Sequence, residues 1–514
     1  MKERFSKVIG AVNIFDGHKF FPTRGYICIR NNEIVETGLG RIPVEIADLA
    51  DEVISFNKEL VMPGIVDTHT FFSGYAIFHV GADISNVKTY ETCKKRLEEY
   101  EESKKVNNVL LGHGWNPKEL KSTDVTDMLE QNYPEKPVIL FAADQSTCIM
   151  NQKAQEIYQY TPDSCYPEKY YRVMREYLND REFIEPEFEG YMKMMNSKGV
   201  TTVKEMGFDD FYGFTDFLRE INNSDRLHLR TFFMSQPVGE KMNLNYAKKM
   251  RDLFTGNQIR FSGFNLMTDG TIAAYKGDLK KPYEGKEFTC TIEVPYDEIE
   301  KDVLVADAEG FRYSLHAQGD RAVAKVADIY EKCQMVDGKL KNRHALTDME
   351  FSDLFDIERL GKIGVTAELY FQIMSLDPSE EIKNNIIRTI GNERGKNYWN
   401  RRKMKDSGMI LSGATDLPLM ITDIPEAIYH SCGGYLLDGN KFQEKNTIGI
   451  SEILEAWTWG GQKNLGMENI VGTLEKGKLA DIAVFDKNFE NVEEAKNNKV
   501  VMTIMDGKVV YDGR

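Results

Sequence analysis

The sequence predicts an α/β protein: a (β/α)8 barrel with a composite β-sandwich from both chain ends and an α/β insertion. Three observations predict this class. Apolar, strand-like segments alternate with helical segments through the middle of the chain, as in repeated βα units with a parallel sheet. Short β-prone segments separated by turns stand at both termini, and a charged, helical stretch follows the first middle strand.

The chain length fits this division. At roughly 150 residues per domain, the 514 residues suggest about three domains. The predicted boundaries place the β-sandwich at residues 1–58 and 471–514, the barrel at 59–75 and 191–470, and the inserted α/β subdomain at 76–190.

The individual elements follow from the apolar patterns. Strands are predicted at both ends, over residues 6–15, 26–30, 480–486, 500–505 and 509–511. Middle strands are predicted over residues 60–66, 138–143, 200–206, 311–316, 365–370 and 409–413, with helices such as 321–333 and 450–464 between them. Residues 98–105 are highly charged, which is typical of a solvated helix surface.

Composition excludes several classes of protein. Hydrophobic residues make up 41% and charged residues 28% of the chain, which is typical of a globular fold. The formal net charge of −16 argues against a polyanion binder, so no nucleic-acid partner is expected. No stretch approaches the roughly 18 apolar residues of a membrane span, so no membrane partner is expected.

Cysteine and histidine usage bounds the chemistry. The seven cysteines are scattered without a CxxC pair, and the charged N-terminal segment shows no secretory signal. We therefore expect a reduced, cytoplasmic protein without a cysteine-based zinc site. The chain has eight histidines, a small pool from which to build a metal site.

Polar residues end four of the predicted barrel strands: His69, Lys204, His316 and Asp416. Active residues of a parallel βα barrel lie at the carboxyl ends of its strands. Imidazole and carboxylate together suit a divalent metal such as zinc. These residues are therefore the candidate site.

The motifs around these residues resemble a known family. In chain order they read PGIVDTH, GVTTVKEMG, LHAQGDRA, GATDLP and GTLEKGKLADIAVFD. This order resembles the amidohydrolase superfamily, and within it the branch of N-substituted formamide deformylases (amidohydrolase family 3), over essentially the whole chain. The resemblance implies a hydrolase of carbon–nitrogen bonds other than peptide bonds, acting on a small-molecule substrate through a metal-activated water.

The resemblance also implies a ligand set, which this chain matches incompletely. His69 matches the first histidine of the strand 1 HxH motif, but the second falls on Phe71. His316 matches the strand 5 histidine, and Asp416 matches the strand 8 aspartate that shuttles the proton.

Two further positions complete the implied set. Lys204 stands at the strand 4 position, where some superfamily members carry a carboxylated lysine, and Asp348 stands where a strand 6 histidine is usual. The resemblance thus implies one divalent ion, zinc, rather than two. His69, His316 and Asp416 would bind it, with Lys204 or Asp348, and Asp416 and Lys204 would be catalytic.

Substrate contacts are predicted for Phe71, Trp115 and Asp269. Trp115 belongs to a Gly-Trp landmark of the insertion, and Asp269 is kept in a segment that reads NLMTDGT where the family has KLFADGS. A family "DGH" segment falls on Asp144, Gln145 and Ser146 and so loses its histidine.

An alternative remains open for the function. The same fold with a decayed or repurposed metal centre would be a small-molecule binder or a metal-free isomerase, because Phe71 and Asp348 replace usual ligands. Alternatives also remain for single residues: Lys204 as an ion-pair partner, Asp348 as a loop residue and Asp416 as a helix cap. His79, His113 and His344 are weaker candidate ligands. The oligomeric state stays open, with a homodimer as one alternative.

Overall fold

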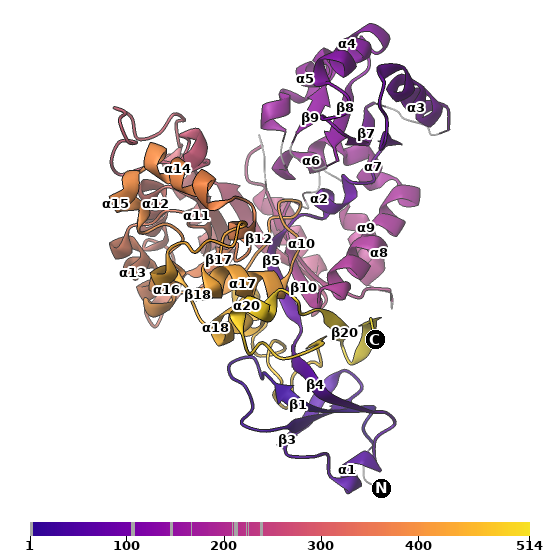
Figure 1. Ribbon diagram of the computed structural model, residues 1–514, viewed down its shortest axis with the longest axis vertical. Coiled ribbons are helices and arrows are strands. Elements are labelled where there is room, and N and C mark those ends of the chain that lie inside the picture. The colour runs from indigo at the N-terminus through magenta and orange to yellow at the C-terminus, as the bar shows by residue number, and fades with distance from the viewer. Residues whose placement is uncertain are drawn as a thin grey trace.

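A parallel, nearly closed eight-stranded barrel forms the centre of the protein (Figure 1). The computed structural model describes residues 4–103, 108–143, 147–165, 167–207, 209, 214–222, 224, 226–236 and 240–514. The barrel strands neighbour one another in chain order: β5 (Ile65–Thr70), β10 (Val200–Glu205), β11 (Arg230–Ser235), β12 (Ile259–Met267), β13 (Tyr313–Ala317), β16 (Ala345–Asp348), β17 (Thr366–Leu369) and β18 (Ile410–Gly413). The predicted fold class is confirmed.

Hydrogen bonds join the first and last strands. The Thr68 hydroxyl donates to the Gly413 carbonyl at 2.8 Å, and the backbone N–H of Asp416 donates to the His69 carbonyl at 2.8 Å. Every residue of β5, β10 and β13 is buried, as expected for parallel strands that are covered on both faces.

Helices connect the strands and cover the barrel (Figure 1). They are α8 (Arg181–Ser197), α9 (Thr215–Asn222), α10 (Leu244–Leu253), η3 (Ile272–Ala274), α11 (Tyr296–Ala308), α12 (Asp320–Tyr330), α13 (Leu354–Ile363), η4 (Ile373–Ser375), α14 (Ser379–Thr389), α15 (Gly391–Gly395), α16 (Arg401–Asp406), α17 (Ile424–Gly433), η5 (Glu444–Asn446), α18 (Ile450–Glu455), η6 (Ala456–Gly460) and α19 (Gly461–Leu465). A small hairpin, β14 (Met335–Val336) and β15 (Lys339–Leu340), follows α12.

The helix predicted over residues 450–464 changes geometry in its middle. The segment η6 is a π-helix between α18 and α19. Its Trp457 is fully buried against β18, and a Cβ on Gly413 would lie 2.1 Å from the indole. A π-turn is a common way to place one side chain at a close approach, and glycine at position 413 leaves room for it.

Both chain ends build one sheet, as predicted. It contains β1 (Lys7–Ile14), β2 (Gly25–Arg30), β3 (Glu33–Leu39), β4 (Val53–Pro63), β19 (Ile482–Phe485), β20 (Val500–Met505) and β21 (Lys508–Asp512), in the order β21-β20-β19-β4-β1-β2-β3. Short helices α1 (Val44–Ala47) and α20 (Val492–Ala495) accompany it. Arg230 of β11 makes a bidentate ion pair with Asp481, both bonds at 3.0 Å, which ties the barrel to this sheet.

The insertion forms its own α/β layer. Its sheet has the order β6 (Ala82–Asp83), β7 (Leu110–Trp115), β8 (Val138–Ala142) and β9 (Cys148–Met150). Its helices are α2 (Phe72–Ala76), α3 (Tyr90–Ser103), α4 (Ser122–Asn132), α5 (Gln152–Tyr158), η1 (Pro162–Ser164), α6 (Pro167–Val173) and α7 (Arg175–Asn179). Figure 1 shows this layer and the terminal sheet at opposite ends of the long axis. In the described part of the chain, no helix combines the length and apolarity needed to cross a membrane.

Candidate active site at the barrel mouth

Four of the predicted site residues lie at the carboxyl ends of barrel strands. His69 is the last residue but one of β5, His316 lies in β13, Asp348 ends β16, and Asp416 follows β18. This is the end at which parallel barrels carry their active sites. We call these four residues the mouth residues.

His69 and Asp416 form the first pair. The His69 Nε2 atom lies 3.6 Å from an Asp416 carboxylate oxygen. Burial lowers the pKa of His69, so the imidazole is neutral near pH 7. Asp67 positions the pair: its carboxylate accepts the His69 backbone N–H at 3.2 Å and the Thr415 hydroxyl at 2.6 Å. Strand β5 and the loop after β18 are thereby held together.

His316 and Asp348 form the second pair. The His316 Nε2 atom lies 3.2 Å from the Asp348 carboxylate, which also accepts a 2.5 Å hydrogen bond from the Gln318 amide. Burial alone would lower the pKa of His316, but the hydrogen bond and charge of Asp348 raise it to about 9. The second pair therefore carries a protonated imidazole, unlike the first.

Both mouth aspartates have left-handed backbone conformations. The φ angle is 75° at Asp348 and 55° at Asp416, and Met349 follows with 55°. Residues other than glycine rarely adopt this region, and strained conformations concentrate at functional sites at a cost of about 1–3 kcal/mol each. The direction of both carboxylates thus depends on a backbone conformation that costs free energy.

The structure corrects the position of Lys204. It lies on β10, the second barrel strand, and not on the fourth. The insertion separates β5 from β10 and contributes no barrel strand, so β10 comes late in the chain. The fourth strand is β12, whose buried Asn265 donates to the Gln236 side chain at 3.0 Å.

Lys204 pairs with a residue that the sequence analysis missed. Its fully buried ammonium contacts the carboxylate of Glu368 on β17 inside the barrel. Burial lowers the pKa of Lys204 to about 7 against the opposing effect of Glu368. The contact leaves Lys204 as a structural partner below the mouth, and gives no support to its predicted catalytic and metal-binding roles.

Glu368 is the centre of the barrel's internal polar network. It accepts hydrogen bonds from Thr347 at 2.8 Å and Asn464 at 2.9 Å, and one oxygen lies 3.8 Å from the His69 Nδ1 atom. Burial alone would raise the pKa of Glu368, but the Lys204 ammonium holds it well below its usual range. The signal in the sequence is a single acid within the apolar strand VTAELY, a pattern that marks an inward-facing charge.

The donor atoms at the mouth are of the types that bind a divalent ion, but they do not lie close enough together to form a metal site. The Nδ1 atoms of His69 and His316 are buried and make no hydrogen bond, and carboxylates lie beside both rings. Among the described residues, however, no three donor atoms at the mouth lie within 4.8 Å of one another. The donors therefore stand as two pairs, whereas a catalytic metal site normally needs three protein ligands.

The one described group of three close donors lies elsewhere and is structural. Asp307, Cys333 and His344 come within 4.8 Å of one another. The His344 Nδ1 accepts the Tyr313 backbone N–H at 2.9 Å, and its Nε2 lies 2.9 Å from Asp307. Both ring nitrogens are thus already bonded, and His344 precedes β16, at the end of the strand opposite to the mouth.

Of the other two predicted substrate contacts, Trp115 does not lie at the mouth, whereas Asp269 follows the carboxyl end of β12 and its carboxylate is engaged by backbone N–H groups. The Asp269 carboxylate accepts three backbone N–H groups, from Gln318, Gly319 and Asp278, at 2.8–2.9 Å. It therefore clamps the loops after β12 and β13. Trp115 is buried in the core of the inserted sheet and donates its indole N–H to the Leu120 carbonyl at 2.9 Å.

Phe71 does lie beside the mouth. It is fully buried, and its ring meets that of His69 edge-on at a centroid distance of 5.6 Å. A phenyl ring in the place of a second ligand orients His69 by packing.

The remaining histidine candidates lie in the insertion. His79 pairs with Glu187 at 2.9 Å, and the His113 Nδ1 contacts the Val80 carbonyl at 2.9 Å. Neither contacts a mouth residue in the described contacts. The "DGH" alignment on Asp144, Gln145 and Ser146 lies outside the described residues.

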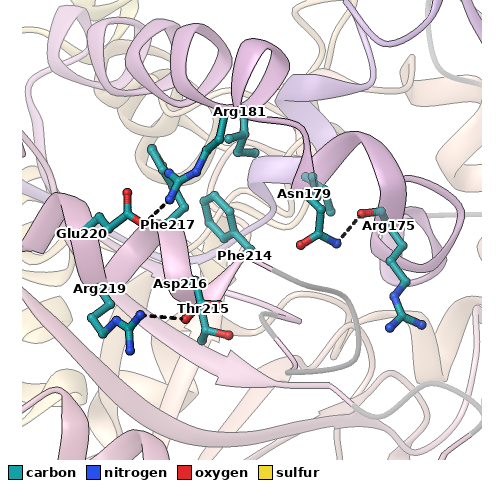
Figure 2. Close-up of a pocket in the computed structure, with 11 residues that line it drawn as sticks. Arg175, Asn179, Arg181, Phe214, Thr215, Asp216, Phe217, Arg219 and Glu220 are labelled. Atoms are coloured by element: carbon teal, nitrogen blue, oxygen red, sulfur yellow. Dashed lines mark hydrogen bonds and ion pairs between the residues drawn. The ribbon is translucent and has the colours of Figure 1, made fainter. Parts of the chain in front are cut away.

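A separate pocket lies on the outside of the barrel (Figure 2). Helices α7, α8 and α9 form it, and its lining includes Arg175, Arg181 and Arg219. Arg181 pairs with Glu220, and Arg219 lies 3.2 Å from Asp216. Two of the three arginines are thus already neutralised, and no mouth residue lines this pocket.

The barrel, its closing loops and the paired acids and imidazoles at the strand ends define the class of a βα-barrel enzyme. The chain belongs to the amidohydrolase family, whose model matches residues 52–511.

Two curated proteins are similar along most of their length. The putative amidohydrolase YtcJ of Bacillus subtilis is 20% identical over 490 residues, which cover 90% of each chain. The protein LONG AFTER FAR-RED 3 of Arabidopsis thaliana is 20% identical over 97% of this chain and 90% of its own.

A solved structure shares the fold. An uncharacterized metal-dependent hydrolase from Pyrococcus furiosus superposes with a TM-score of 0.71 at 20% identity, covering 94% of this chain and 99% of that one.

Proposed function

We propose that this protein is a hydrolase that cleaves an amide-type carbon–nitrogen bond of a small molecule at the barrel mouth. The observation that carries the proposal is the pair of imidazole–carboxylate contacts, His69–Asp416 and His316–Asp348, at one end of the barrel. Family membership and the similarity to a putative amidohydrolase support it. The finer assignment to the formamide deformylase branch is part of the same proposal.

Asp416 has the position of a general base. Its carboxylate is held by the loop hydrogen-bonded to the His69 carbonyl and lies beside the neutral His69 ring. In the proposed reaction Asp416 takes a proton from the attacking water and passes it to the leaving nitrogen, so that its charge is restored. Asp348 orients the His316 ring at the mouth through the contact at its Nε2 atom.

We propose one divalent ion, zinc, as the cofactor, held by His69, His316 and Asp416 with Asp348 as a further donor. Metal-dependent hydrolases among the similar structures and the unbonded ring nitrogens support this. A bound ion of this kind supplies a Lewis acid and lowers the pKa of water. The two pairs would have to rearrange to offer three ligands, and because metal competes with the proton on His316, affinity should rise with pH.

The hydrolase proposal is tested by a substrate panel. We expect the purified protein to release amine or ammonia from N-substituted formamides or small N-acyl compounds, at a rate that depends on Asp416. The measurement is amine release followed by mass spectrometry. A protein that binds such compounds but hydrolyses none of them would contradict the proposal.

Metal content is tested separately. We expect about one equivalent of a divalent transition metal in protein purified without chelator, and at least a tenfold loss of metal affinity in a His316→Ala variant. Elemental analysis and metal titration measure both, with His113→Ala as the matched control. Less than about 0.1 equivalent, without rebinding, would exclude the metal site.

A repurposed mouth is the second candidate function. It is favoured by Phe71, which has no atom that can bind a metal, and by Asn265, which stands where the family segment has a lysine. The Lys204–Glu368 ion pair inside the barrel favours it as well. In that case the protein would bind a small molecule or isomerise it without a metal. Unchanged ligand binding in the metal-free protein would favour this candidate over the first.

A further inference from the structure

Two histidines lie close together where the inserted layer meets the barrel. His79 follows α2 and contacts Glu187 of α8, a helix that covers the barrel, and His113 lies near the end of β7 in the inserted sheet. Their ring centres are 6.4 Å apart. The side chain of His79 is 48% exposed and that of His113 is 16% exposed. Both rings therefore border solvent, and neither has a part in the proposed reaction at the mouth.

The turn after α2 brings a carboxylate to the same place. Strand β6 runs parallel to β7, and its Asp83 lies opposite His113 in the register. The close approach of this turn to β7 needs glycine at position 81, which has φ of 74° and where a Cβ would lie 1.8 Å from the Leu111 carbonyl oxygen. An Asp83 carboxylate oxygen consequently lies 3.8 Å from the His113 Nε2 atom.

Hydrogen bonds hold both rings in the form that binds a metal. The His113 Nδ1 atom lies 2.9 Å from the Val80 carbonyl oxygen, which can only accept, so Nδ1 carries the proton. The His79 Nδ1 atom faces a Glu187 carboxylate oxygen at 2.9 Å in the same way. Within the described part of the chain, no hydrogen bond involves the Nε2 atom of either ring, so each neutral ring keeps a lone pair there. Histidines that bind metals almost always donate their other ring N–H to a carboxylate or carbonyl.

The spacing of the two rings requires a small movement before they can share an ion. Zinc–nitrogen bonds of about 2.1 Å in a tetrahedral site place the centres of two imidazoles roughly 5–6 Å apart. Among the described residues, His79, His113 and Asp83 do not form a group of three donors within 4.8 Å. The half-exposed His79 ring stands in the turn after α2, so its rotation towards His113 can close this distance.

We propose that His79, His113 and Asp83 bind one divalent transition-metal ion of the zinc type, at a site separate from the mouth. We call these three residues the junction site. Three protein ligands leave the fourth tetrahedral position to water. Imidazole nitrogen favours zinc and similar ions over magnesium or calcium, which prefer oxygen ligands. The bound ion would join the turn after α2 to the inserted sheet, beside Glu187 of α8, and this role does not depend on hydrolysis at the mouth.

Zinc titration of the full-length protein tests the junction site. We expect calorimetry to show one Zn²⁺ equivalent that His79→Ala and His113→Ala each weaken by at least about tenfold. His316→Ala should leave this equivalent in place, because His316 lies at the mouth. Conversely, His113→Ala should leave any ion at the mouth in place. The two sites are thus lost separately, and the junction site is measured even if the mouth binds no metal.

His18 provides a matched control. Its Nδ1 atom also lies 2.9 Å from a carboxylate, that of Glu455, and its side chain is 44% exposed. It packs against Trp459 and not against a second histidine. The His18→Ala variant should therefore bind zinc as the parent protein does.

Melting temperature gives a second readout. An ion that binds only the folded state stabilises it, so Zn²⁺ should raise the melting temperature of the His316→Ala protein. It should not raise that of the His316→Ala/His113→Ala double variant. His79→Ala changes a half-exposed side chain and keeps the test valid if His113→Ala does not fold. Zinc affinity unchanged in both His79→Ala and His113→Ala, or no zinc binding by the His316→Ala protein, would overturn the proposal.

Discussion

An Asp416→Asn variant is expected to lose about a thousand-fold in kcat/KM with little change in KM. The asparagine keeps the shape of the side chain but cannot accept the proton of the attacking water, and general-base catalysis is typically worth about 10²–10⁴-fold. Asparagine also tolerates the left-handed conformation with φ of 55° that Asp416 adopts. The fold and the loop after β18 should therefore be preserved, and steady-state kinetics on an active panel compound measures the effect.

The matched control is an aspartate with the same backbone conformation. Asp337 is exposed between β14 and β15 and has φ of 51°. Asp337→Asn makes the same chemical change in the same conformation, away from the mouth, and should leave kcat/KM within about twofold. Equal activity of Asp416→Asn and the parent protein would remove Asp416 from the mechanism.

Glu368→Ala is expected to destabilise the protein by about 3–5 kcal/mol, because it leaves the Lys204 ammonium buried without its partner. Hydrogen bonds from Thr347 and Asn464 lose their acceptor at the same time. Chemical unfolding of the variant measures the loss. The double variant Lys204→Met/Glu368→Leu removes both charges and should recover most of it.

The loss should also depend on pH in a defined direction. Lys204 has its usual pKa of 10.5 in the unfolded chain and about 7 in the fold, so the unfolded state binds more protons between these values and stability rises with pH there. Without Glu368 the folded pKa falls further. The difference in unfolding free energy between the Glu368→Ala variant and the parent protein should therefore widen by about 1 kcal/mol from pH 8 to pH 6. A difference that stays constant from pH 8 to pH 6 would show that Lys204 is neutral in the parent fold across this range.

The barrel and the terminal sheet were predictable because their signals are local. Apolar runs such as residues 200–206 and 409–413 mark buried parallel strands, and the alternating segments at both ends mark a sheet. His69, His316 and Asp416 were predictable for a related reason: each directly follows or ends such a run. Strands β11, β12 and β16 were not predicted, because their polar residues interrupt the apolar pattern.

Other features depend on contacts between distant segments. Lys204 was placed on the wrong strand because order around a barrel depends on which segments pair, and the inserted layer pairs with itself. Glu368 could not be recognised, because the sequence does not show which other charge will lie beside a charged residue in the fold. The motifs did not show that Trp115 packs inside the inserted sheet or that the Asp269 carboxylate bonds backbone N–H groups, because a motif does not show which way a side chain faces.

The sequence by itself determined the fold class, the joining of the two chain ends and three of the strand-end residues, because burial and strand periodicity are properties of short segments. Only the tertiary structure decided that Lys204 is paired with Glu368 and that the donors of the mouth stand in two pairs. Both features depend on contacts between charged residues that are far apart in the sequence. Such residues come into contact only in the folded barrel, so no local sequence pattern shows their pairing.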